Sequence, residues 1–382
     1  MPLLHVVQTV FSCLVLTLVF ALAETVSASA AGNGSEPGQP NAVQETYALA
    51  KNLSPELKHR LKPLEKPGRY IGGCFPGQHS EHDKRSWGRA TQGSAWDPFD
   101  NVYYTLMARK DGAESMRVMT WGDSEQKRVF VAETQWEFGR FPHQGLALYR
   151  PFREAPVRFF AQANVNEAKD RKVNANAFIL NLLEWRRKEG RMTIVASWKL
   201  FDESVYAPCQ MNVCISPDGK TLVCRARRQN DKVWLFGVWK TEKLFKALAD
   251  QGTASKPVDA QGLCERIFAS PWGARNVAMQ SLATDGTLLY ALCSPPDLTP
   301  HEIFVMDFEG RKVLERRPSL EGFEIAPELH KRYIEGEGLF FAKVAGKLSL
   351  IMDMSTAVYD RPDENGMPSL KWTRRNDYYV LF

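Results

Sequence analysis

One phrase occurs five times along the chain and limits the fold more than any other feature. In its clearest copy, 279–292 (MQSLATDGTLLYAL), a Gln precedes small and apolar residues, an Asp-Gly turn and an alternating strand, which predicts a β-hairpin. The phrase begins at five positions: Gln92, Gln144, Gln210, Gln280 and Glu337. Strand-rich copies spaced by 52, 66, 70 and 57 residues are typical of a β-propeller. The sequence therefore predicts an all-β, five-bladed β-propeller with short helical insertions.

The last copy is followed by too few strand-like runs to complete a blade. After Glu337 only 348–353 and 378–382 have the alternating pattern of a strand. Propellers close their ring by pairing the two chain ends within one blade, which leaves no open edge between the first and last sheets. We therefore expect 69–74 to supply the missing outer strand.

The N-terminus, 1–30, has the pattern of a secretory signal peptide. An apolar run at 10–22 precedes small residues, and A-x-A motifs predict cleavage after Ala23 or Ala30. Thirteen apolar residues are fewer than the roughly 20 that span a bilayer, although an uncleaved anchor is the alternative. The sequence thus predicts a secreted or periplasmic protein without a membrane span in the mature chain.

Three further regions follow this signal. Residues 31–50 are rich in Gly, Ser, Pro, Asn and Gln, a composition typical of a disordered tether. In 51–90 we expect a short helix at 55–64, with Ser54 as its N-cap, a lead-in loop and the closing strand. The propeller itself is predicted to occupy 91–382.

Composition and missing motifs exclude several classes of protein. Charged residues make up 24% of the chain and are interspersed, with a formal net charge of +5, so nucleic acid is not expected as a partner. The chain contains no H-E-x-x-H, G-x-S-x-G or Walker A motif, which argues against zincin, α/β-hydrolase and NTPase chemistry. We expect no cofactor. Six cysteines follow the signal and permit disulfides, but their connectivity is not readable from the sequence.

The repeated Gln or Glu positions are the first candidate ligand-binding residues. Equivalent positions of five blades form a ring at one level of the central channel, so Gln92, Gln144, Gln210, Gln280 and Glu337 are predicted to lie together. Their side chains either satisfy backbone groups of the adjacent blade or form a polar funnel for a sugar, an ion or water. His143, beside Gln144, is expected near the channel mouth and is included in this set.

A second cluster precedes the first blade. His79, His82 and Asp83 stand within five residues, and H-x-x-H on a loop can chelate a transition metal if further ligands are present. The alternative is a solvated loop. These residues are weak candidates, and the sequence does not establish a metal site.

Four phrases carry a resemblance to a known family. They are 91–98 (TQGSAWDP), 279–293 (MQSLATDGTLLYALC), 336–341 (GEGLFF) and the closing 374–382 (RRNDYYVLF). They resemble the recurring TQG, QG-x-x-x-DG, EPEGL and terminal Arg-Asn-x-x-Tyr phrases of bacterial propellers described as teichoic acid biosynthesis protein C-like or phage-type signalling proteins. The resemblance spans about 91–382 and implies a five-bladed fold in a cell-envelope setting.

Two functions of different classes remain. The first is an exported, non-catalytic propeller that binds an envelope glycopolymer, such as a polysaccharide, or a partner protein. The alternative is a glycan-active enzyme, a glycoside hydrolase or lyase, that uses Asp97 and Glu337 at the channel mouth as its two carboxylates. The binding protein is the main expectation, because only one of the five ring positions is acidic.

Overall fold

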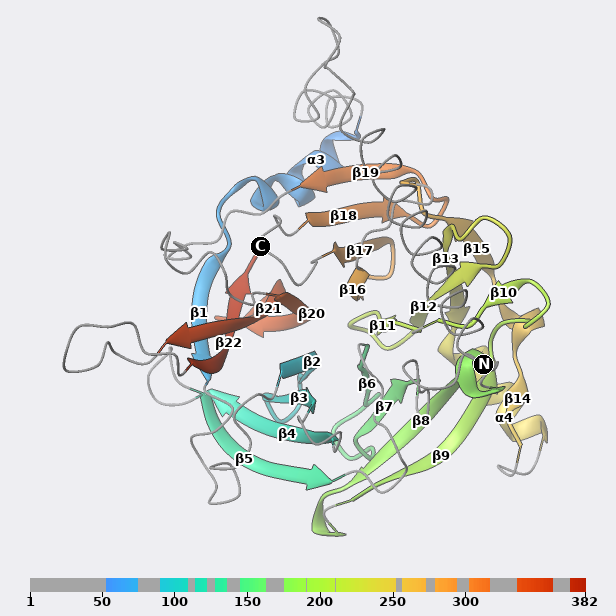
Figure 1. The fold of residues 1–382 in the computed structure, drawn as a ribbon, viewed down its shortest axis with the longest axis horizontal. Coiled ribbons are helices and arrows are strands. Elements are labelled where there is room, and N and C mark those ends of the chain that lie inside the picture. The colour runs from blue at the N-terminus through green and yellow to red at the C-terminus, as the bar shows by residue number, and fades with distance from the viewer. Residues whose placement is uncertain are drawn as a thin grey trace, which may run out of the picture. The chain divides into compact units, whose positions relative to one another are not determined.

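The chain divides into two units, Met1–Lys51 and Asn52–Phe382, and the described residues belong to the second. In this unit strands are arranged around a common centre in an all-β, propeller-like fold (Figure 1). The computed structural model describes residues 53–74, 90–108, 114–121, 128–135, 145–162, 175–189, 191–209, 211–251, 256–272, 279–293, 302–316, 335–359 and 372–382.

One four-stranded sheet joins the two ends of the propeller. Its order is β1-β22-β21-β20, and its strands are β1 (Arg69–Cys74), β20 (Glu335–Val344), β21 (Lys347–Tyr359) and β22 (Trp372–Val380). β1 pairs antiparallel with β22, from Arg69 opposite Val380 to Cys74 opposite Asn376. The segment expected to supply the outer strand therefore does so.

The largest sheet consists of two antiparallel meanders in the order β2-β3-β4-β5-β9-β8-β7-β6. A single parallel pair, Gln135 opposite Arg191, joins the meanders through β5 and β9. The strands are β2 (Ala90–Asp97), β3 (Val102–Ala108), β4 (Glu114–Trp121), β5 (Arg128–Gln135), β6 (Ala147–Tyr149), β7 (Arg158–Ala161), β8 (Ile179–Arg186) and β9 (Arg191–Lys199), with β14 (Val258–Asp259) also paired to β9.

Two further sheets complete the described strands. One has the order β10-β12-β13-β15, with β11 also paired to β12, and the other has the order β16-β17-β18-β19. Their strands are β10 (Tyr206–Ala207), β11 (Val213–Ile215), β12 (Thr221–Arg228), β13 (Trp234–Lys240), β15 (Arg266–Ala269), β16 (Met279–Thr284), β17 (Leu288–Cys293), β18 (Glu302–Asp307) and β19 (Lys312–Arg316).

The strands β2, β6, β11, β16 and β20 lie nearest the centre of this arrangement (Figure 1). Each contacts the next in cyclic order, and β20 contacts β2. These inner strands therefore surround a common axis, and residues at equivalent heights on them face one another across it.

The repeated Gln or Glu has a defined backbone role in three of the five copies. The strand register shifts on either side of Gln92 in β2, Gln280 in β16 and Glu337 in β20. Each is thus the extra residue of a β-bulge, a feature that bends a strand and increases its twist. In these three copies the repeated residue therefore lies at an irregularity near the start of the inner strand.

The glycine that follows this position permits close approach of adjacent inner strands. Gly145 has a positive φ of 99°, and a Cβ placed on it would lie 2.9 Å from backbone atoms of Asn212 and Val213. Only glycine satisfies both conditions without a backbone shift. The Gln-Gly pair is therefore explained by strand packing around the axis.

A short helical segment packs against the sheets before β1 begins. The helix α3 (Pro55–Leu61) continues into the 3₁₀-helix η1 (Lys62–Glu65), and the Ser54 hydroxyl caps α3 by accepting a hydrogen bond from the Leu57 amide at 3.2 Å. Leu61 and Leu64 are buried in the core shared by the β16–β19 sheet and the sheet β1-β22-β21-β20, which we call the closing sheet. The other helices are α4 (Thr241–Gln251), η3 (Ala175–Phe178), η4 (Arg187–Glu189) and η5 (Gln261–Leu263).

The described cysteines show no disulfide. Cys209, Cys214, Cys224, Cys264 and Cys293 are free thiols. Cys214 and Cys224 lie on the paired strands β11 and β12, where burial raises the pKa of both. Both therefore serve as small apolar residues of the core.

The packing of η1 leads to a stability prediction. Leu64→Ala should lower the free energy of unfolding by about 2–5 kcal/mol, because it leaves a cavity in the shared core. Lys66→Ala, two residues on and exposed, is the matched control and should change it by less than about 0.5 kcal/mol. Urea unfolding measures both variants, and equal midpoints for Leu64→Ala and the parent chain would contradict the packing.

Candidate functional site

A pocket of about 370 Å³ lies at one end of the inner strands. Each inner strand contributes lining residues from its C-terminal half, among them Ala95, Leu148, Ile215, Ala283 and Phe340. Because these strands surround the axis, the pocket lies where their C-terminal halves come together, and we call it the mouth. Its volume is at the small end of the range of about 300–1,000 Å³ for ligand sites, so it suits a small molecule.

The lining is mostly apolar, with few charged groups. Aromatic rings come from Trp96 and Phe99 on one side. Among the described lining residues, the charged side chains are Arg150, Asp218 and Lys343. Asp218 is thus the one carboxylate in the described wall.

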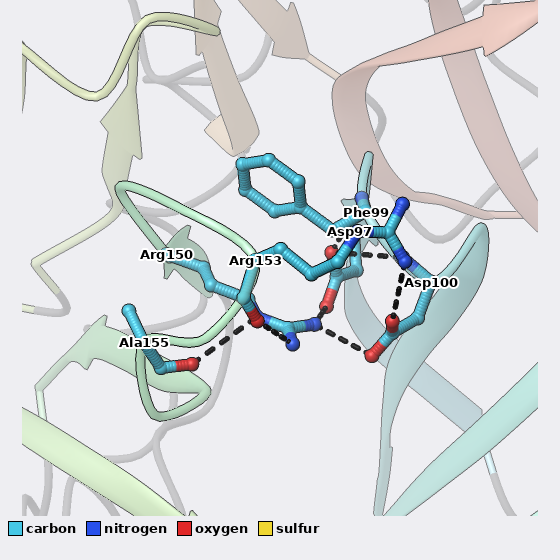
Figure 2. Close-up of polar contacts among 6 residues, drawn as sticks. All are labelled: Asp97, Phe99, Asp100, Arg150, Arg153 and Ala155. Atoms are coloured by element: carbon cyan, nitrogen blue, oxygen red, sulfur yellow. Dashed lines mark hydrogen bonds and ion pairs between the residues drawn. The ribbon is translucent and has the colours of Figure 1, made fainter.

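Arg150 lies in an ion-pair network beside the pocket (Figure 2). Its Nη1 donates to Asp97 Oδ2 at 2.7 Å and to Asp100 Oδ2 at 2.6 Å. The Asp97 side chain is fully buried, and its other oxygen accepts a hydrogen bond from the Phe99 amide at 2.9 Å. Asp97 therefore holds the turn after β2 and binds the Arg150 guanidinium.

The same guanidinium also holds the loop after β6. Nε donates to the Ala155 carbonyl at 3.2 Å, and Nη2 donates to the Arg153 carbonyl. Burial disfavours the charge of Arg150, but hydrogen bonds to Asp100 and Asp97 outweigh it, so the pKa of Arg150 is raised. The permanent cation thus connects two loops that border the pocket, and we name Asp97, Asp100 and Arg150 the mouth clamp.

A tight turn after β11 presents Asp218. The Ser216 hydroxyl donates to Asp218 Oδ1 at 2.5 Å and accepts a hydrogen bond from the Thr221 amide at 2.9 Å. The Lys220 amide also donates to Asp218 Oδ1, at 3.1 Å. Gly219, with φ of 72°, closes the turn in a conformation that glycine adopts without strain.

These contacts stabilise the ionised form of Asp218. Partial burial alone raises the pKa of this carboxyl, but hydrogen bonds from Ser216 and the Lys220 amide, with the charges of Lys220 and Lys240, outweigh it. The pKa of Asp218 is therefore below its ordinary value. Asp218 is a carboxylate at neutral pH, and its Oδ2 lies 3.8 Å from Lys220 Nζ, a loose ion pair between two exposed side chains.

Lys343 supplies a further positive charge at the pocket. It lies near the C-terminal end of β20 and is exposed at the pocket rim. Within the described segments, no carboxylate forms an ion pair with it. Its ammonium group is thus available to a ligand.

Two residues of the predicted ring lie at the other end of the inner strands. Gln280 and Glu337 are buried at the bulges near the start of β16 and β20, and the Gln280 amide donates to the Glu335 carboxylate. A Cβ on Gly338 would lie 3.4 Å from the Ser94 amide nitrogen. Asp97 stands three residues beyond Ser94, or about 10 Å at 3.3 Å per residue. The structure therefore does not bring Asp97 and Glu337 together.

The remaining predicted residues fall outside the described parts. The backbone of Gln92 lies in β2 but its side chain is not described, and Gln144, Gln210 and His143 lie outside the described residues, as do His79, His82 and Asp83. No group of three potential ligands in the described segments is placed to hold a metal ion.

Sequence reasoning missed most of the residues at the mouth. Three of the missed lining residues, Arg150, Ser216 and Lys343, stand six positions after a repeated Gln or Glu, and Asp218 stands eight positions after Gln210. This offset is visible in the sequence, and it would have directed attention to the ends of the inner strands rather than to their starts.

No helix in the described part of the chain is both long and apolar enough to cross a membrane. The apolar run 10–22 lies outside the described residues.

No family model and no curated protein matches the chain, so the family resemblance stays a prediction. Among solved structures it is similar to a periplasmic gluconolactonase of Pseudomonas aeruginosa, at 12% identity and a TM-score of 0.34, over 74% of this chain and 71% of that one. A putative 6-phosphogluconolactonase from Bacteroides uniformis is similar at 10% identity and a TM-score of 0.27, over 74% and 71%. A prolyl endopeptidase is similar at 11% identity and a TM-score of 0.29, over 85% of this chain and 56% of that one.

These comparisons correct the main functional expectation. The first two neighbours are named as lactonases, the second as a putative one, whereas the main expectation was a non-catalytic propeller that binds a glycopolymer or a partner protein. That function is withdrawn. The substrates in these names belong to the neighbours, and the reaction of this chain is argued below from its own pocket.

The mouth clamp leads to a second prediction. Arg150→Met should lower the free energy of unfolding by about 3–5 kcal/mol, because it leaves Asp97 buried without its cation. Arg153→Met is the matched control, since Arg153 is exposed and approaches Asp100 only at 3.8 Å, and it should be almost neutral. Adding Asp97→Asn to Arg150→Met should recover part of the loss. Chemical unfolding measures this cycle, and equal effects of the two arginine variants would refute the clamp.

Proposed function

We propose that the protein is a hydrolase of small esters or lactones that acts in the pocket that we call the mouth. The observation that carries this proposal is the charged set of the pocket, in which one ionised carboxylate, Asp218, and one unpaired ammonium group, Lys343, line the same cavity. Hydrolysis of an ester needs a single general base and a group that stabilises the oxyanion. We assign the first role to Asp218 and the second to Lys343, which line the same pocket.

The glycoside hydrolase version of the enzyme hypothesis has less support. That mechanism uses two carboxyl groups about 5–5.5 Å or 6.5–9.5 Å apart. Glu337 lies at the other end of its strand, and Asp97 is fully buried against Arg150. The described pocket wall supplies one carboxylate where two are required.

The proposed reaction uses each group once. Asp218 accepts a proton from a water molecule whose oxygen attacks the carbonyl carbon of the substrate, and Lys343 stabilises the negative charge that develops on the carbonyl oxygen. The bond from the carbonyl carbon to the ester oxygen then breaks, and the proton held by Asp218 passes to the departing alkoxide. The products are an alcohol and a carboxylic acid, which ionises, and in a lactone both groups remain on one molecule.

We propose five blades for the ring that forms this pocket. The two meanders of the largest sheet are antiparallel within themselves but meet only through the parallel pair Gln135 and Arg191, which supports counting them as two blades. The cyclic contacts of the five inner strands support the same count.

We also propose that the enzyme is exported and works in a secreted or periplasmic setting. Intact-mass measurement of the secreted protein should give a chain that begins after Ala23 or Ala30, because A-x-A motifs end there. Secreted protein that retains residues 1–22 would show that the apolar run is an anchor instead.

The catalytic role of Asp218 leads to a further prediction. Asp218→Asn should lower kcat/KM for p-nitrophenyl acetate and δ-valerolactone by about 100-fold or more, the usual contribution of a general base. The amide retains an acceptor for the Ser216 hydroxyl, so the turn should persist and the melting temperature should change little.

Asp202→Asn is the matched control for this assay. Asp202 also accepts a backbone hydrogen bond within a turn, from the Ser204 amide at 2.8 Å, but it does not line the pocket. Its rate should stay within about twofold of the parent rate. Unchanged hydrolysis by Asp218→Asn would refute the proposal, and so would a parent protein that hydrolyses neither p-nitrophenyl acetate nor δ-valerolactone.

A further inference from the structure

The pocket wall has few side chains that could bind the hydroxyl groups of a sugar. Among its described residues there is no Asn, Gln, His, Glu, Thr or Tyr. A hydroxyl group that is buried without a hydrogen-bond partner is strongly disfavoured. The side chains of the wall therefore offer few hydrogen-bond partners to a ligand with many hydroxyls.

Most of the polar side chains that do line the pocket are already hydrogen-bonded. Trp96 Nε1 donates to Asn101 Oδ1 at 3.1 Å, and Ser216 binds Asp218 and the Thr221 amide. Arg150 is held by the two carboxylates of the mouth clamp and by two backbone carbonyls. What remains for a ligand is the carboxylate of Asp218 and the ammonium group of Lys343.

The apolar wall extends outward to the rim. Leu348 lines the pocket and is 39% exposed, and Phe152, which follows the lining residue Pro151, is 57% exposed. Phe99 and Phe341 are half-buried lining residues. A carbon chain that leaves the pocket would thus continue to contact apolar side chains, whereas a polyol would not.

We propose that this pocket takes esters or lactones that carry an apolar acyl or alkyl substituent, and that it discriminates against polyhydroxylated sugar lactones. The substituent packs against the apolar wall and Leu348, and the carboxylate formed by hydrolysis pairs with Lys343. This assignment rests on the proposed function for the reaction, but the ligand class rests on the wall alone and can be tested by binding.

The test compares two carboxylates of equal charge, sodium octanoate and sodium gluconate, by isothermal titration calorimetry on the full chain. Octanoate should bind at least about tenfold more tightly, because its methylene groups leave water for the apolar wall. Gluconate has a similar length but carries hydroxyl groups that the wall does not satisfy. Equal or tighter binding of gluconate, or no binding of octanoate, would overturn the inference.

Two variants, each with a matched control, test whether octanoate and gluconate bind in this pocket. Leu348→Gln should weaken octanoate by about threefold or more and leave gluconate unchanged, whereas Ile267→Gln, an exposed apolar residue outside the pocket, should affect neither. Lys343→Gln should weaken both ligands, and Lys347→Gln, on the same hairpin but outside the pocket, should weaken neither. Octanoate binding that is insensitive to Leu348→Gln and Lys343→Gln would place it elsewhere and refute the assignment.

Hydrolysis assays separate this inference from the proposed function. The parent protein should hydrolyse p-nitrophenyl octanoate with a kcat/KM at least about tenfold above that for gluconolactone. If gluconolactone is the better substrate, the enzyme proposal stands and the ligand class is wrong. If octanoate binds as described but no ester is hydrolysed, the ligand class stands and the proposed reaction is wrong.

Discussion

The pairing of β1 with β22 is the interaction on which the rest of the structure depends. Without it, β22 would expose an unpaired edge in a ring whose inner strands require neighbours on both sides. The pairing is reinforced by apolar burial, because Leu61 and Leu64 bring α3 and η1 onto the core of the adjoining sheets. The closing sheet also carries β20, which contacts β2 as well as β16. Lys343 on β20 and Asp97 on β2 therefore hold their positions only in the closed ring.

The two ends of the inner strands perform different tasks. At the starts, bulges and Gly145 let adjacent strands approach closely, and side chains connect neighbours: Ser94 donates to Asp353 at 2.6 Å, and Asn212 donates to the Gln280 carbonyl at 2.7 Å. At the other ends, residues of the strands and of the turns after β2, β6 and β11 line the pocket. Rigid packing at the starts is what fixes the relative positions of the turns, which is the usual arrangement for functional loops on a scaffold.

Strand periodicity and the repeated phrase predict the strands and the closing pair well, because the alternation of apolar residues is a direct consequence of burial. The candidate site was harder to predict. The repeated Gln and Glu stood out as chemistry, yet Gln280 and Glu337 are buried at bulges where backbone geometry explains their repetition. The position that Arg150 occupies in the repeat carries other residue types in the other copies, and a search for repeats emphasises the positions that stay constant. A functional mouth built from different residues on each strand is therefore hidden from it.

The electrostatics of the mouth follow from this division. In the mouth clamp Arg150 binds two carboxylates, and Arg153 approaches Asp100 at 3.8 Å, so these four formal charges cancel. The clamp thus shapes the entrance without giving it a field of either sign. Asp218 and Lys343 then remain as the charges that a ligand meets, one negative and one positive, against an apolar wall. Such a pair suits a neutral, polarised ester carbonyl better than a fully charged substrate, because a charged ligand would be attracted by one group and repelled by the other.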